Sequence, residues 1–190
     1  HIRYADTREL NKAIATELNV EGNPIDSFTD LVLEVVPAQV TLVPDGPEAI
    51  TSNSGWDTKT HLQFLRDKIA RFHAAGIRTS IFLDPVPELV KYAAETGTDR
   101  IELYTEAYAK GYTQNREQAI ESYYKTAVEA QKYGLGIIAG HDLSLENLKY
   151  FADVVPGLLE VASGHALISD AIYLGFENTI QLYLRQLKKG

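Results

Sequence analysis

The sequence predicts an α/β fold on a parallel sheet, of the (β/α)8 TIM barrel class. Six short apolar runs alternate with long amphipathic runs, and none of the dipeptides typical of β-hairpins joins two of the short runs. The short runs lack a clean polar alternation, as expected of strands that helices cover on both faces. A complete barrel has eight strand–helix units, so this chain carries about six of the eight.

Each expected strand is a short run with β-type composition. The second run, QVTLVP, is rich in β-branched residues, and the third, IRTSIFLD, is the clearest strand. The six expected strands span 18–21, 39–44, 77–84, 100–104, 135–139 and 159–163.

The expected helices lie between these strands and carry start and stop signals. Asp57 and Ser144 precede helical runs, and Gly76, Gly97 and Gly134 stand where helices should end before a strand. The expected helices span 6–17, 25–36, 58–75, 86–95, 114–133, 144–154 and 171–188.

The domain organisation is expected to be simple. No linker, composition break or low-complexity segment divides the 190 residues, so 1–190 should form a single barrel domain. The chain contains no methionine and opens in a loop before a helix, so we expect the N-terminal portion, the first two βα units, to be missing from it. A complete doubly wound open sheet of six strands is the alternative.

Composition excludes several classes of function. The net charge of -8 argues against a nucleic-acid partner, because phosphate neutralisation needs clustered lysine and arginine. There is no cysteine for disulfides or thiolate metal sites, and no apolar run approaches the roughly 18–20 residues of a membrane helix. No signal peptide is visible, so we expect a cytoplasmic protein without a membrane partner.

Polar or titratable groups follow every expected strand. Because ligands bind at the carboxyl ends of parallel strands, these groups are candidates for a site. They are Glu21, Asp45, Asp84, Glu102 with Thr105, His141, and Gly164 with His165.

Two of the strands end on the same dipeptide, Gly140-His141 and Gly164-His165. Histidine is the usual proton carrier near neutral pH. Glycine lets the backbone approach an anion, and barrels often hold a phosphate after their last two strands at the N-terminus of a short helix. The two turns therefore predict a phosphate grip beside a proton donor, although glycines that only terminate strands would look the same.

Other features give weaker predictions. The polar loop 44–57 is a candidate lid, or a plain surface loop. No lysine stands at a strand end, which disfavours an enzyme-bound Schiff base. Tyrosines cluster between 104 and 124 and are expected to pack helices or a subunit interface.

Motifs along the whole chain resemble the pyridoxine 5′-phosphate synthase family of bacterial vitamin B6 biosynthesis. Their order and spacing carry the resemblance more than any one of them does. They are HIR at the start, LNVE, LVP followed by AITSNSGWD, GIRTSIFLD, RIELYTEAYA, GLGIIAGHDLS and ASGHALI.

The resemblance implies a (β/α)8 barrel, commonly an octamer. It also implies condensation of 1-deoxy-D-xylulose 5-phosphate with 3-amino-2-oxopropyl phosphate, with no cofactor and no metal. Such a transferase would bind small phosphorylated substrates and act as a homo-oligomer.

The resemblance also assigns roles by position. It makes Glu21 the catalytic carboxylate, His141 the proton donor and Glu102 the carboxylate that stabilises the transition state. It places His1 and Thr51 on the pentulose phosphate. The remaining contacts, to the aminoketone phosphate, fall to Asp142, Gly164 and His165.

The chain departs from the family pattern at two places. Asp142 stands where the family has the second glycine of Gly-His-Gly, and a carboxylate beside a phosphate is unfavourable unless it turns away. Tyr104 and Glu106 replace a histidine and a glycine. Two alternatives therefore stay open: a metal-dependent barrel epimerase or lyase acting on a sugar phosphate, and a non-catalytic barrel that binds a phosphorylated ligand.

Overall fold

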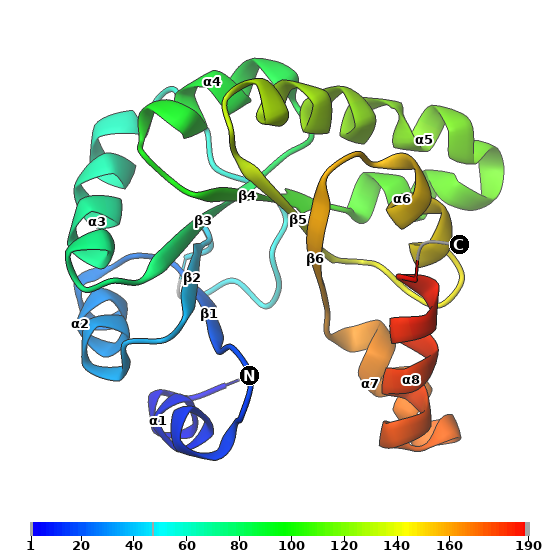
Figure 1. Cartoon of the computed structure of the whole chain (residues 1–190), viewed down its shortest axis with the longest axis horizontal. Helices are drawn as coiled ribbons and strands as arrows, with labels where there is room; N and C mark the ends of the chain where they lie inside the picture. The colour runs from blue at the N-terminus through cyan, green and yellow to red at the C-terminus, as the bar shows by residue number, and fades with distance from the viewer. Residues whose placement is uncertain (1, 47, 189–190) are drawn as a thin grey trace. The chain divides into compact units, whose positions relative to one another are not determined.

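The computed structural model describes residues 2–46 and 48–188 (Figure 1). Its strands follow one another in the sheet in chain order, β1-β2-β3-β4-β5-β6. The pairs β1–β2, β2–β3 and β5–β6 are parallel. An order that never reverses is that of a barrel, whereas a doubly wound sheet reverses at its switch point. The predicted fold class is confirmed over the doubly wound alternative.

The strands fall where the apolar runs predict them. They are β1 (Asn19–Gly22), β2 (Gln39–Leu42), β3 (Arg78–Leu83), β4 (Arg100–Tyr104), β5 (Gly136–His141) and β6 (Leu158–Ser163). The helices are α1 (Tyr4–Ala13), α2 (Asp26–Val35), α3 (Leu62–Ala74), α4 (Pro87–Glu95), α5 (Glu106–Lys132), α6 (Leu148–Val154), α7 (His165–Leu174) and α8 (Phe176–Gln186).

The expected helices differ from the observed ones by up to four residues at an end, and two of them differ more. Helix α5 begins at Glu106 instead of 114, and Asn115 interrupts it with an extended backbone (φ -156°). The Asn115 side chain accepts a hydrogen bond from the Gln118 amide at 3.0 Å, so it caps the second half, which is the helix expected over 114–133. The run 171–188 holds parts of two helices, because Gly175 takes a positive φ of 80° and ends α7.

The chain divides into two compact units. The first comprises the residues up to Asp84 with Glu88–Glu102. Its core lies between the strands and helices α2 and α3, which flank them in Figure 1. Buried members of this core are Val20, Phe28, Val32, Val40, Leu42, Trp56, Leu65, Ile69, Phe72, Ile77 and Ile81.

The second unit comprises Pro85–Pro87 with the residues from Leu103 onward. Its centre is aromatic: Tyr108, Tyr123 and Phe151 meet edge to face with ring centroids 5.0 to 5.9 Å apart. Tyr108 and Tyr123 are fully buried, as expected of tyrosines that pack helices. None of the helices in the described part of the chain combines the length and apolar character needed to cross a membrane.

The loop 44–57 is fixed at both ends. At its start, the Asn23 amide donates to the carbonyls of Pro44 and Asp45 at 3.2 and 3.0 Å. At its end, the buried Trp56 indole donates to the Leu42 carbonyl at 3.0 Å. The first and last residues of the loop are thereby held by hydrogen bonds.

Gly55 is required by the close approach of the loop to β3. A Cβ atom at position 55 would lie 2.3 Å from the Asp84 amide nitrogen and 2.5 Å from Leu83 Cα. We expect Gly55→Ala to lower the free energy of unfolding by about 2 kcal/mol, because backbone atoms must shift to admit the methyl group. Urea denaturation monitored by Trp56 fluorescence measures this loss.

Gly46→Ala is the matched control in the same loop, since a Cβ atom at position 46 meets nothing within 4 Å. We expect it to change the unfolding free energy by less than about 0.5 kcal/mol. Equal losses in the two variants would contradict the packing argument.

Candidate functional site

The ends of β5 and β6 bring the two Gly-His turns together. The strands pair in parallel, with Gly140 opposite Ala162 and His141 opposite Ser163. The His141 and His165 rings consequently lie 6.2 Å apart between centroids, in an edge-on arrangement. Two residues separated by 24 positions in the sequence thus become neighbours at one strand edge.

His141 adopts a backbone conformation that is unusual for its type. Its φ is 91°, in the region that favours glycine. The Thr105 hydroxyl holds the chain on both sides: it donates to the Gly140 carbonyl at 2.6 Å and accepts from the Asp142 amide at 3.0 Å. The Thr105 amide adds a second bond to Gly140, at 3.2 Å. Thr105 therefore stabilises the strained turn that presents His141.

Three side chains surround the His141 ring. The Asp142 carboxylate lies 2.9 Å from His141 Nδ1. The Tyr104 ring meets the imidazole edge-on, with centroids 5.4 Å apart. Glu106 interacts with the imidazole electrostatically. The chain departs from the family pattern at these three residues, and Asp142 and Tyr104 contact the predicted proton donor directly.

Glu106 is held as an anion. Hydrogen bonds from the Lys110 ammonium group and then from the Tyr104 hydroxyl keep the pKa of the Glu106 carboxyl below its ordinary value. The Lys110 Nζ lies 2.6 Å from Glu106 Oε1. The negative charge of Glu106 is therefore partly compensated beside the histidine.

Gly164 and His165 open helix α7. Gly164 is the residue before its first turn, and a Cβ atom there would meet nothing within 4 Å. Helix α8 steadies α7, because the Tyr183 hydroxyl donates to Asp170 Oδ2 at 2.9 Å. Burial, with this hydrogen bond adding to it, raises the pKa of Tyr183 to about 12, so the phenol keeps its proton and remains a donor.

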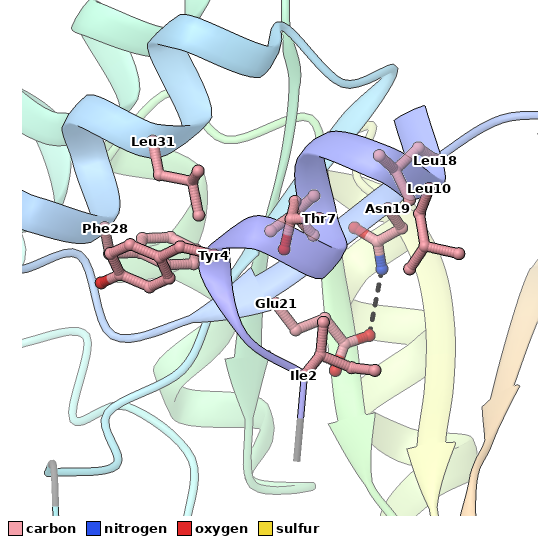
Figure 2. A pocket seen from close by; sticks show the side chains of 10 residues that line it. Ile2, Tyr4, Thr7, Leu10, Leu18, Asn19, Glu21, Phe28 and Leu31 are labelled. Atoms are coloured by element: carbon pink, nitrogen blue, oxygen red, sulfur yellow. Dashed lines mark hydrogen bonds between the residues drawn. The ribbon is translucent and has the colours of Figure 1, made fainter. Parts of the chain in front are cut away.

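In the first unit, Glu21 lies on β1 beside a pocket of about 310 Å³. Asn19 Nδ2 donates to Glu21 Oε1 at 3.0 Å, and the Thr41 hydroxyl donates to Asn19 Oδ1 at 3.3 Å. Figure 2 shows the Asn19 amide directed at the carboxylate, with Ile2 and Leu10 nearby. The other residues that line the pocket are Tyr4, Thr7, Leu18, Val20, Phe28 and Leu31.

The remaining predicted site residues are Glu102, Thr51 and His1. Glu102 is on β4 and is 1% exposed. Thr51 lies exposed in the loop 44–57. His1 falls outside the described residues. Within 2–46 and 48–188, no three histidine, cysteine, aspartate or glutamate residues form a group that could hold a metal ion.

Comparison with known proteins identifies the family. The family described as "Pyridoxal phosphate biosynthesis protein PdxJ" matches residues 1–189. The chain belongs to the PdxJ family. A relative from Christiangramia forsetii, named pyridoxine 5′-phosphate synthase, is 60% identical over 188 residues, which are 99% of this chain and 79% of the relative. A relative of the same name from Cytophaga hutchinsonii is 57% identical and is also covered to 79%.

Solved structures with low sequence identity resemble the fold of this PdxJ-family chain. A mutant tryptophan synthase α-subunit from Pyrococcus furiosus matches with a TM-score of 0.60 at 15% identity, over 96% of this chain and 70% of that chain. Phosphoribosylanthranilate isomerase from Thermotoga maritima matches with a TM-score of 0.60 at 14% identity, over 98% and 81%. At such low identity these similarities show the fold alone.

Sequence reasoning missed Asn19 as a partner of the predicted catalytic carboxylate. A signal was present, because a polar residue two positions before Glu21 on a strand lies on the same face. The hydroxyl of Thr105 was noted only as a strand-end group. The two hydrogen bonds of this hydroxyl depend on the positive φ of His141. A histidine in a sequence gives no indication that its φ is positive.

Thr105→Val tests whether this hydroxyl holds the turn. The change keeps the shape of the side chain but leaves the Asp142 amide without its acceptor, so we expect a loss of about 1–3 kcal/mol in unfolding free energy. Thermal and urea denaturation measure it.

Thr126→Val is the matched control in the same unit. Thr126 is also fully buried, and its hydroxyl donates only to the Ser122 carbonyl of its own helix, at 2.8 Å. Removing the Thr126 hydroxyl leaves no amide without an acceptor, so the loss in unfolding free energy should stay below about 1 kcal/mol. A Thr105→Val protein as stable as this control would refute the role given to Thr105.

Proposed function

We propose that the chain catalyses the formation of pyridoxine 5′-phosphate from 1-deoxy-D-xylulose 5-phosphate and 3-amino-2-oxopropyl phosphate, with release of phosphate and water. The observation that carries this proposal is the identity of 52 to 60%, over 98 to 100% of the chain, to relatives named pyridoxine 5′-phosphate synthase. The juxtaposed His141 and His165 at the β5 and β6 ends support it, because the reaction requires proton transfer beside a phosphate group.

The chemistry needs acid–base groups more than a covalent catalyst. The amine of one substrate attacks the ketone of the other, so the imine forms between substrates and requires no lysine from the enzyme. Loss of water and ring closure then require several proton transfers, which carboxylate and imidazole groups provide. Holding the two reactants by their phosphates would supply the advantage of proximity.

We assign the proton donor to His141 and the carboxylate roles to Glu21 and Glu102. The hydrogen bond from Asn19 to Glu21 supports the first carboxylate, since it limits the orientations of the carboxylate beside the pocket. The burial of Glu102 supports the second, since a charged group acts more strongly on charge that develops beside it where water is excluded.

The phosphate of the aminoketone is assigned to the turn at Gly164 and His165. The open space before Gly164 and the first turn of α7 support this assignment. The Asp142 amide is engaged by Thr105, which leaves the α7 end as the better donor. His1 and Thr51 remain assigned to the pentulose phosphate.

His141→Asn tests the proton donor. Asparagine tolerates a positive φ, so the turn should survive, while turnover should fall by about 100-fold or more because the general acid is lost. The measurement is formation of pyridoxine 5′-phosphate from both substrates in the intact protein.

His61→Asn is the matched control, since His61 is an exposed histidine at the start of α3, outside the assigned site. It should retain turnover within about twofold. An active His141→Asn enzyme would remove the assignment, and a folded but inactive wild type would remove the proposed reaction.

We also infer that the protein acts as a homo-oligomer. Large apolar side chains on α7 and α8 are exposed, with Ile172 at 76%, Tyr173 at 88% and Phe176 at 57%, which is typical of a surface that another subunit covers. Sedimentation velocity should show an assembly that Tyr173→Glu weakens and Tyr133→Glu, at an exposed tyrosine at the end of α5, leaves intact. A wild-type monomer would contradict this inference.

A further inference from the structure

The carboxylate of Asp142 and the imidazole of His141 form a close pair. Asp142 Oδ2 lies 2.9 Å from His141 Nδ1, and the two side chains are only 29% and 22% exposed. An ionised carboxylate only accepts hydrogen bonds, so Nδ1 must carry the proton between them. The other ring nitrogen, Nε2, then carries no proton in the neutral imidazole.

Hydrogen bonds hold the backbone of Asp142 at both its amide and its carbonyl. The Asp142 amide donates to Thr105 at 3.0 Å, and its carbonyl accepts from the Asn147 amide group at 3.3 Å. Asn147 is itself held, because its carbonyl accepts from the buried Tyr108 hydroxyl at 2.7 Å. The backbone amide and carbonyl of Asp142 are thus both hydrogen-bonded, and its carboxylate lies against the imidazole of the preceding residue.

The other groups around the imidazole restrict where it can act. The Tyr104 ring covers one edge, Glu106 contributes a second negative charge, and the His165 ring lies 6.2 Å away on the side of α7. A phosphate held at the start of α7 would be repelled by a carboxylate that faced it. Pairing with His141 orients the Asp142 carboxylate toward Nδ1, which lowers this repulsion without removing the charge of the carboxylate.

We propose that Asp142 is a positioning residue that holds the His141 ring through Nδ1–H, so that Nε2 is the atom that exchanges protons with the substrate. The second clause rests on the proposed function, whereas the first is independent of it. The arrangement follows the rule that the hydrogen bond at one ring nitrogen sets the tautomer at the other. Its loss should therefore affect the rate of the chemical step more than substrate binding.

The tautomer is measured by long-range 1H–15N spectroscopy of the protein with labelled histidine. The chain has five histidines, and His141→Asn identifies the signal of His141. We expect neutral His141 to carry its proton on Nδ1 in the wild type and to move toward the Nε2–H form in Asp142→Ala. A wild-type His141 with its proton on Nε2 would overturn the proposal.

Kinetics provide the second readout. We expect Asp142→Ala to lower kcat by about 10- to 100-fold, less than for a fully buried orienting aspartate, with the KM of each substrate changed by less than about twofold. Asp142→Asn keeps one acceptor oxygen and should lie between the wild type and Asp142→Ala. Asp153→Asn, which removes a carboxylate paired with Lys149 on the surface of α6, is the control and should keep the wild-type kcat.

The outcomes separate the proposals. An unchanged kcat in Asp142→Ala would overturn the positioning role. If the KM also rose while kcat stayed the same, the result would indicate that Asp142 binds substrate instead. A wild type that makes no pyridoxine 5′-phosphate, yet shows the Nδ1–H form, would remove the proposed function and leave the positioning of the ring by Asp142 in place. Graded loss of kcat across Asp142→Asn and Asp142→Ala, together with the tautomer change, would support both.

Discussion

The parallel pairing of β5 with β6 is the constraint on which the candidate site depends. Strands that run in the same direction end at the same edge of the sheet, so residues far apart in the chain emerge together. The pairing of Gly140 with Ala162 and of His141 with Ser163 fixes this edge, and the Ser163 hydroxyl extends the tie by donating to the Leu143 carbonyl at 2.7 Å. A shift of one residue in this register would turn the adjoining side chains to the opposite face.

The buried aromatic residues of the second unit support this edge of the sheet through hydrogen bonds. The Tyr123 hydroxyl donates to the Tyr104 carbonyl at 2.9 Å, and the Tyr108 hydroxyl donates to the Asn147 carbonyl at 2.7 Å. Burial raises the pKa of Tyr108, so its phenol keeps its proton and stays a donor. Polar groups of the packed core thus hold the segments at Tyr104 and Asn147, next to the turn that carries His141.

Sequence patterns predicted the strands better than the contacts at their ends. The apolar run at 135–139 predicts β5, and the glycines at 76, 97 and 134 predict helix ends, which their positive φ values of 71° to 86° confirm. The start of α5 was missed because Asn115 interrupts its helical periodicity. The contact of Asp142 with His141 was also beyond prediction, because it depends on a backbone conformation that histidine rarely adopts.

The positive φ of His141 lowers the stability of the protein at a residue that the proposed reaction needs. A left-handed backbone costs a residue with a Cβ atom roughly 1–2 kcal/mol, a cost that glycine avoids. Variants selected only for expression or heat resistance would therefore tend to replace this histidine, and they would gain stability while they lost catalytic activity. The same residue explains why engineering of this turn should be screened for turnover first and for stability second.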